Sequence, residues 1–254
     1  MNTAGVDIGI KTTKVVLLNC DKIIARSCVL TGWKPQQAGE SALTAALADA
    51  RMARDDVTQI VATGAGRQAF SLAQRNVTEV TADARALALL HPQVRTVIDV
   101  GAEEARALKC TAGRMLDFAV NEKCAAGAGV FIETMARTLE VSLDEMGALS
   151  LQAVGAATLN SQCTVFAESE VVSLIHTQTP KAEIVRAVHD AIAGRVASLA
   201  RRVGAEPEIA LVGGIAHNIG FIDAVKRELA VDIIVPRDPE FIGALGAALI
   251  ARES

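Results

Sequence analysis

The stretch VDIGIKTTK at residues 6–14 decides the fold of this chain. An apolar strand runs into Asp7 and Gly9, and a second strand begins near Lys14, so the segment predicts two strands joined by a tight turn. Backbone N–H groups, threonine hydroxyls and lysines in such a turn can hold a phosphate, and Asp7 can hold a hydrated Mg²⁺. The alternative is an ordinary hairpin in which glycine and threonine serve only the turn.

A second stretch, TVIDVG at residues 96–101, ends another strand with the same Asp-x-Gly pattern. The two patterns lie about ninety residues apart, and each is followed by further strand candidates, which indicates a duplicated unit that begins with a strand. We therefore expect a domain boundary near residues 92–93.

Strand-like and helical patterns alternate along the chain, which predicts the α/β class. The expected strands lie at 4–10, 14–18, 23–30, 59–63, 94–100, 115–120, 209–212 and 231–235, and the expected helices at 38–54, 82–90, 127–140, 184–203, 218–229 and 239–252.

Composition narrows the class of protein. Among 254 residues, 51% are hydrophobic and 21% are charged, which excludes a disordered chain. No apolar run reaches the roughly 20 residues that span a bilayer, and the segment after Met1 lacks the pattern of a signal peptide, so we expect a cytoplasmic protein with no membrane contact. A net charge of −4 and only six Phe and one Trp argue against nucleic acid as a partner.

Three more glycine turns follow predicted strands, at residues 63–66, 99–103 and 213–216. Ligands of open α/β sheets bind outside the carboxyl ends of the strands, so these turns are candidates for one ligand site. The Gly213-Gly214 pair would let the backbone approach a flat ligand such as adenine, although it would equally serve a plain strand-to-helix turn. Neither a P-loop nor a strand-linked GxGxxG occurs.

Two of the five cysteines precede predicted helices. Cys124 lies in KCAAGAG and Cys163 in SQCTVF, and a thiolate gains from the N–H groups of a helix N-terminus. Taken singly, both also fit the role of small buried apolar side chains. Cys20, Cys28 and Cys110 lie in strand-like stretches and are expected to be ordinary, and no CxxC pair occurs.

Together these motifs resemble the BadF/BadG/BcrA/BcrD ATPase family, which comprises activators of 2-hydroxyacyl-CoA dehydratases and ATPase subunits of benzoyl-CoA reductase. The resemblance spans essentially the whole chain and is most specific at 123–129 and 163–170. It implies the duplicated actin-like ATPase fold shared by acetate and sugar kinases, Hsp70 and actin, with two lobes and a nucleotide cleft between them. Lobe I would comprise residues 1–92 and 237–254, and lobe II, with the cluster-bearing helices, residues 93–236.

The resemblance also implies the chemistry. Members form dimers that share one [4Fe-4S] cluster through two cysteines of each subunit, here Cys124 and Cys163, and ATP drives a low-potential electron from ferredoxin or flavodoxin into the dehydratase or reductase partner. The implied catalytic residues are Asp7, which would also organise Mg²⁺, Asp99 and Glu103. The implied residues for ATP or ADP are Gly9, Lys11, Thr12, Thr13, Lys14, Gly101, Ala102, Gly127, Gly213, Gly214 and Ile215.

One loop departs from the family pattern. Where members commonly read Asp-x-Gly-Gly-Gln-Asp-Ser-Lys, residues 99–106 read DVGAEEAR. Ala102 adds a Cβ where phosphate would approach, and Glu103 replaces an amide that can orient water with a carboxylate that repels phosphate. Hydrolysis is then slow, altered or left to the second ATPase subunit, so both a homodimer and a heterodimer stay open. Two alternatives to the electron activator are a small-molecule kinase on the same fold and a non-hydrolysing subunit that only scaffolds the cluster.

Overall fold

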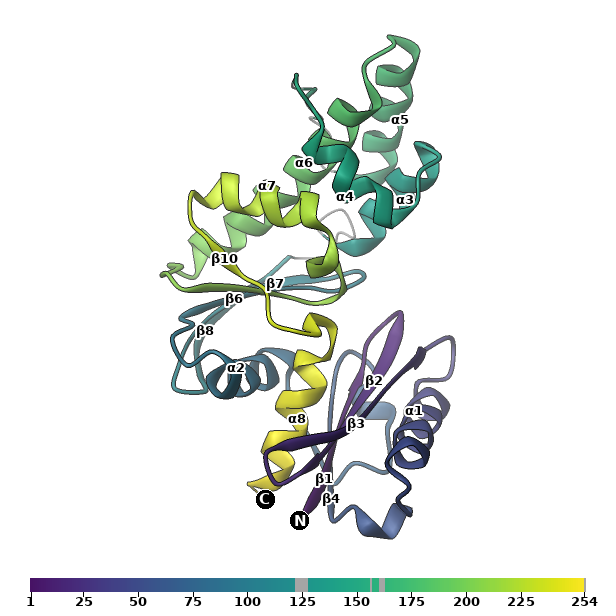
Figure 1. The fold of residues 1–254 in the computed structure, drawn as a ribbon, viewed down its shortest axis with the longest axis vertical. Coiled ribbons are helices and arrows are strands. Elements are labelled where there is room, and N and C mark those ends of the chain that lie inside the picture. Colours follow the sequence, from purple (N-terminus) through teal and green to yellow (C-terminus); the bar gives the residue numbers. More distant parts are fainter. Residues whose placement is uncertain (122–127, 156, 160–162, 254) are drawn as a thin grey trace. The chain divides into compact units, whose positions relative to one another are not determined.

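The computed structural model describes residues 1–121, 128–155, 157–159 and 163–253, and the chain divides into two compact units (Figure 1). The first unit is Met1–Val94, Cys110–Leu116 and Glu240–Ser254, and the second is Arg95–Lys109 and Asp117–Pro239. No sequence pattern indicates that residues 110–116, the tip of a hairpin, group with the first unit.

The first unit is built on a five-stranded sheet with the strand order β3-β2-β1-β4-β5. Its strands are β1 (Asn2–Ile8), β2 (Thr12–Asn19), β3 (Lys22–Leu30), β4 (Gln59–Thr63) and β5 (Arg75–Asn76), and its helices are α1 (Pro35–Ala50), α2 (Glu79–Leu90) and α8 (Ile242–Arg252). Strands β1 to β3 pair antiparallel, and β4 pairs parallel to β1.

Alternation along β1 places a helix on each side of this sheet (Figure 1). Val6 and Ile8 point into the apolar core that α1 covers, whereas Gly5 faces α8. A Cβ at Gly5 would lie 1.9 Å from the Ala244 carbonyl oxygen, so only glycine allows α8 this close. Asp7 lies on the same side of the strand as Gly5, because side chains alternate with a period of two.

The second unit repeats the plan with the strand order β10-β9-β6-β7-β8. Its strands are β6 (Thr96–Val100), β7 (Ala105–Thr111), β8 (Arg114–Val120), β9 (Ile209–Val212) and β10 (Ile233–Ile234), and its helices are α3 (Gly129–Thr138), α4 (Leu143–Leu151), α5 (Thr164–His176), α6 (Lys181–Arg202) and α7 (Ile219–Leu229). A large apolar core joins the sheet to α3, α6 and α7, and α3, α4 and α5 gather at one end of α6 (Figure 1).

Helix α4 is an element that the hydrophobic pattern does not predict. Its start carries a complete capping box, because Ser142 Oγ accepts from the Glu145 N–H at 3.3 Å and Glu145 Oε2 accepts from the Ser142 N–H at 2.9 Å. The S-x-x-E signature is therefore the sequence signal that identifies this helix. No helix in the described part of the chain is both long and apolar enough to cross a membrane.

Candidate functional site

The first turn joins β1 to β2 and presents Asp7 at the end of β1. Asp7 lies opposite Lys14 in the β1–β2 ladder, and Lys14 Nζ is 3.5 Å from Asp7 Oδ2. The turn closes through a 3.1 Å hydrogen bond from the Gly9 N–H to the Thr12 carbonyl. Lys11 is exposed at its tip. The turn therefore carries a carboxylate paired with Lys14 and, at its exposed tip, Lys11.

Thr31, which the sequence pattern does not single out, braces this turn from the end of β3. Its hydroxyl donates to the Gly9 carbonyl at 2.7 Å and lies 2.9 Å from Thr13 Oγ1, and its N–H donates to the Lys11 carbonyl at 3.0 Å. Because the Thr31 proton goes to Gly9, the Thr13 hydroxyl donates to Thr31. Thr13 is fully buried, so its side chain supports the turn from within the protein.

The second turn repeats the first in the other unit. Asp99 lies opposite Arg106 in the β6–β7 ladder, and Arg106 Nη1 donates to Asp99 Oδ2 at 2.6 Å. The Gly101 N–H donates to the Glu104 carbonyl at 2.9 Å, which matches the closure of the first turn. Arg106 Nη2 also reaches Glu104 Oε2 at 2.8 Å. Arg106 thus pairs with Asp99 in the second unit as Lys14 pairs with Asp7 in the first.

A glycine from a neighbouring strand end packs against each Asp-x-Gly turn. Gly64 follows β4 with φ of +90°, and a Cβ there would lie 2.5 Å from the Ile8 carbonyl and 2.6 Å from Asp7 Oδ1. Gly213 follows β9 with φ of +89°, and its Cβ would lie 2.3 Å from the Val100 carbonyl and 2.9 Å from Asp99 Oδ1. In each unit the backbone of a glycine in the left-handed region packs against the aspartate of the Asp-x-Gly turn. This shared packing is direct structural evidence of duplication.

Helix α3 begins on the second turn. The Gly129 N–H donates to the Gly101 carbonyl and the Val130 N–H to the Ala102 carbonyl, both at 2.9 Å. These are two N–H groups that a helix start leaves without intrahelical partners. Glu103, which follows these two carbonyls in the loop, is exposed. The second turn and the first residues of α3 are therefore one hydrogen-bonded piece of structure.

The two glycines after β9 have different roles. Gly213 is fixed by its own backbone packing, whereas a Cβ at Gly214 would meet nothing within 4 Å in the described structure. Gly214 is exposed and Ile215 is half-buried beside it. The described residues therefore give no steric reason for glycine at position 214. The space beside Gly214 is open, and this is where the sequence predicts that adenine binds.

Asp83 is a further acidic residue that the sequence pattern does not single out. It lies on α2 and is only 2% exposed. A Cβ at Gly243 on α8 would lie 3.5 Å from Asp7 Oδ2 and 3.8 Å from Asp83 Oδ1, so the two carboxylates approach the same small space. A buried acid in an otherwise apolar helix face is the signal that could have drawn attention to it.

The structure describes Cys163 and the three cysteines that are expected to be ordinary. Cys163 is the half-buried N-cap of α5, and its thiol is free. Cys28 is exposed on β3, and Cys110 is buried on β7. Cys124 and Gly127 lie outside the described residues. Within the described residues, no three His, Cys, Asp or Glu side chains gather as a group that could hold a metal ion.

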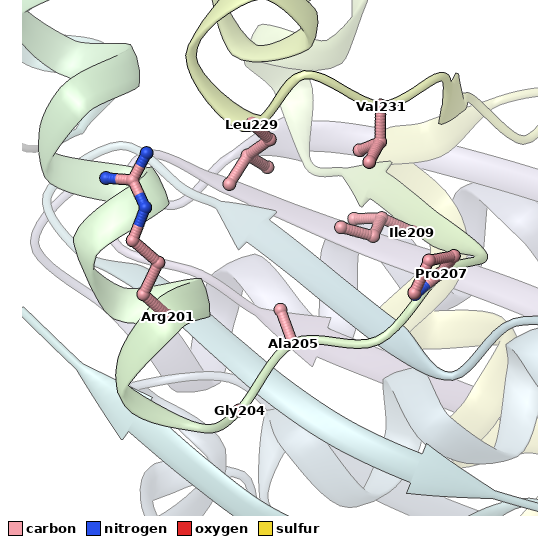
Figure 2. Close-up of a pocket in the computed structure, with 7 residues that line it drawn as sticks. All are labelled: Arg201, Gly204, Ala205, Pro207, Ile209, Leu229 and Val231. Atoms are coloured by element: carbon pink, nitrogen blue, oxygen red, sulfur yellow. The ribbon is translucent and has the colours of Figure 1, made fainter.

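A pocket of about 320 Å³ lies elsewhere in the second unit (Figure 2). Ile209 and Pro207 line it at the amino end of β9, together with Leu229 and Val231. The glycine turn follows the opposite, carboxyl end of the same strand. Arg201 at the rim donates to the carbonyl and the carboxylate of Glu228, each at 2.8 Å. This pocket is therefore separate from the residues of the turns.

Comparison with known proteins decides the family. The model of the BadF/BadG/BcrA/BcrD ATPase family matches residues 4–251. The chain belongs to this family. Among its relatives, the activator of lactoyl-CoA dehydratase from Anaerotignum propionicum is 40% identical over 255 residues, covering 100% of this chain and 98% of that protein. A subunit of the benzoyl-CoA reductase from Thauera aromatica is 31% identical, covering 97% of this chain and 92% of that protein.

Solved structures confirm the fold of this family member. The activator of the 2-hydroxyisocaproyl-CoA dehydratase from Clostridium difficile, determined with bound ADPNP, superposes with a TM-score of 0.93 at 38% identity, over 100% of this chain and 95% of that chain. A ROK hexokinase from Thermus thermophilus shares the fold alone, with a TM-score of 0.55 at 16% identity over 100% and 98%. The expected actin-like ATPase fold is thereby confirmed.

Proposed function

We propose that this family member is an ATP-dependent electron-transfer activator of a 2-hydroxyacyl-CoA dehydratase or benzoyl-CoA reductase component. The observation that carries the proposal is the pair of hydrogen bonds from Gly129 and Val130 to the Asp99–Ala102 turn. Any change of that turn on hydrolysis moves the start of α3, the helix that follows the Cys124 motif. The first turn, with Asp7 and Lys14, and the Gly213–Ile215 turn would take the Mg²⁺-phosphate and adenosine parts of ATP.

Cys163 is the candidate cluster ligand that the described residues include, and a cysteine thiolate is the usual ligand of an iron–sulfur cluster. Cys163 presents a free, half-buried thiol at the start of α5, where N–H groups of the first turn can donate hydrogen bonds to a cluster sulfur. Cys163 and Cys124 would hold one [4Fe-4S] cluster together with the same two residues of a second ATPase subunit. When bound, such a cluster stores a single low-potential electron, supplied by a ferredoxin or flavodoxin and passed to the acyl-CoA enzyme.

The surface beside Cys163 favours the proposal that a second subunit contacts this part of α5. Val165 and Phe166 follow Cys163 closely and are 67% and 68% exposed. Adjacent exposed apolar side chains of this size are typical of contact surfaces. Helix α5 also contacts α3, and the Thr138 hydroxyl donates to Glu168 Oε1 at 3.1 Å between them.

The coupling can be tested with two glycine-to-alanine variants. The electron paramagnetic resonance spectrum of the anaerobic, reduced protein should differ between MgADP and MgATP. In Gly129→Ala that difference should shrink, because the new Cβ lies 3.2 Å from the Gly101 carbonyl and strains the link to α3. Gly194→Ala is the matched control, since its Cβ meets nothing within 4 Å in the described structure. A parent spectrum that is the same with MgADP and with MgATP would contradict the proposal.

The altered loop favours a second candidate, a subunit that binds nucleotide and scaffolds the cluster without efficient hydrolysis. Ala102 and Glu103 replace residues that family members commonly use near the phosphate. Restoring them with Ala102→Gly and Glu103→Gln should raise steady-state hydrolysis about tenfold, because one recovered water-positioning contact contributes roughly 1.4 kcal/mol. A double variant no faster than the parent would remove this candidate.

A further inference from the structure

His189 is a buried histidine that the activity proposed above does not use. It lies on α6 and is 0% exposed. Its Nε2 is 3.1 Å from Nδ2 of Asn218, the N-cap of α7. Nδ1 of His189 has no hydrogen-bond partner among the described residues. The contact with Asn218 is therefore the polar interaction that explains an imidazole here.

The position of the imidazole proton follows from the helix cap. Asn218 Oδ1 accepts from the Phe221 N–H at 3.1 Å, which is the bond an N-cap side chain must make. The amide nitrogen of Asn218 consequently faces His189 and can only donate. Nε2 must then carry the lone pair, so the proton sits on Nδ1.

Close packing locks this arrangement. A Cβ at Gly220 on α7 would lie 2.8 Å from Ser150 Cβ on α4 and 3.0 Å from His189 Cε1 on α6. A Cβ at Gly147 on α4 would lie 3.1 Å from Asn218 Oδ1. Glycines thus let three helices meet around the ring of His189.

Asn218 is tied in turn to the candidate nucleotide turn. Its N–H donates to the Ile215 carbonyl at 2.9 Å, and the Ala216 N–H donates to the Gly213 carbonyl at 3.1 Å. The residues from Gly213 to Asn218 therefore form one short hydrogen-bonded segment whose far end is held by His189.

We propose that His189, as the neutral Nδ1–H imidazole, is a positioning residue that holds the Gly213–Ile215 turn in its nucleotide-binding conformation. This inference rests on the proposed function, which places the adenosine of ATP at that turn. Burial supports the neutral form, because it lowers the pKa of His189 from 6.5 to about 4. Asp190 and Asp223 act against this lowering and Arg227 adds to it.

Three variants separate positioning from general packing. His189→Gln can place Oε1 near the position of Nε2 and accept from Asn218, whereas His189→Leu cannot. Ser150→Ala is the control, because Ser150 is buried beside the same ring and has no hydrogen-bond partner among the described residues. We expect calorimetry to show ADP binding weakened about tenfold in His189→Leu, and within about twofold of the parent in His189→Gln and Ser150→Ala, since the Asn218 amide loses the acceptor that orients it and a hydrogen bond contributes roughly 0.5–1.5 kcal/mol net.

A nitrogen-15 NMR spectrum of the parent at pH 7 tests the same inference without any substitution. The His189 signals should show a protonated Nδ1 and an unprotonated Nε2. A proton on Nε2, or ADP binding in folded His189→Leu equal to that of the parent, would overturn the inference. Equal losses in His189→Gln and His189→Leu would also overturn it. Failure of the parent to bind ADP would instead contradict the proposed function. The tautomer of His189 would still show whether Nε2 accepts from Asn218 as the inference requires.

Discussion

Arg106 Nη1 lies 2.6 Å from Asp99 Oδ2, across the ladder that joins β6 to β7. Both side chains are largely buried, at 12% and 13% exposure. Lys14 and Asp7 occupy the corresponding positions of the first unit at 3.5 Å. The duplicated turn therefore keeps its carboxylate beside a cation in both halves, although the type of cation differs.

This pairing predicts that charge matters more than the guanidinium shape at position 106. Arg106→Lys should keep ATP hydrolysis within about threefold of the parent, because the first unit already uses lysine at this register. Arg106→Met should lower it about tenfold, equivalent to roughly 1.4 kcal/mol, because Asp99 loses a charge-assisted hydrogen bond. Phosphate release under anaerobic conditions measures both. Equal losses in the two variants would show that the guanidinium bridge between Asp99 and Glu104 decides the rate.

The glycine pair after β9 predicts two different failures. Gly213→Ala should lower the free energy of unfolding by about 2 kcal/mol or more, because its Cβ collides with the Val100 carbonyl at a left-handed backbone position. Gly214→Val should leave the melting temperature near that of the parent but weaken ADP binding about tenfold or more, because it fills open space at the turn. Thermal unfolding and calorimetry separate the two effects. Undiminished ADP affinity in Gly214→Val would show that adenosine does not bind at this turn.

The Thr31 brace predicts a defect in nucleotide affinity that serine repairs. Thr31→Val removes the bonds to the Gly9 carbonyl and to Thr13 and should raise the KM for ATP by up to about thirtyfold, since each of the two lost bonds is worth roughly 1 kcal/mol. Thr31→Ser should stay within about twofold of the parent. Trp33, the chain's single tryptophan, is fully exposed two residues away and gives a fluorescence signal for nucleotide titrations. A valine variant with unchanged KM would show that the turn holds its shape without the brace.

Burial of His189 predicts a stability that falls as the pH is lowered. Its folded-state pKa, about 4, lies below the ordinary 6.5, so the unfolded chain binds more protons between these values. Stability is therefore lost as the pH drops below about 6.5, by roughly 2 kcal/mol between pH 7 and pH 5.

Urea unfolding of the parent and of His189→Gln at both pH values isolates this contribution, because the carboxylates, including Asp190 and Asp223, are common to both proteins and Arg227 stays charged. The parent should lose more stability than His189→Gln over this range. Parallel losses would mean that His189 is not buried as a neutral group.

Local patterns in the sequence predict part of the site. The Asp-x-Gly endings at Asp7 and Asp99 are visible because strand, acid and turn glycine are contiguous. Gly213 is visible for the same reason. These three positions fix the turns in the structure.

Residues that act over long sequence distances are not predictable in this way. Thr31 meets Gly9 only because β3 returns beside β1–β2, and Arg106 meets Asp99 only through strand register. His189 reaches Asn218 through the packing of α6 on α7. Asp83 on α2 approaches the space beside Asp7 and Gly243 only because α2 packs against α8. Each depends on tertiary contacts that periodicity and propensity do not carry.

Iron content tests the central claim most directly. The anaerobically isolated parent should contain about two iron atoms and two acid-labile sulfides per chain, because one four-iron cluster would be shared by two chains. Cys163→Ser should lose the iron, whereas Cys28→Ser, which also removes one thiol and lies exposed on β3, should keep it. Full iron in Cys163→Ser, or a parent without iron, would contradict the account.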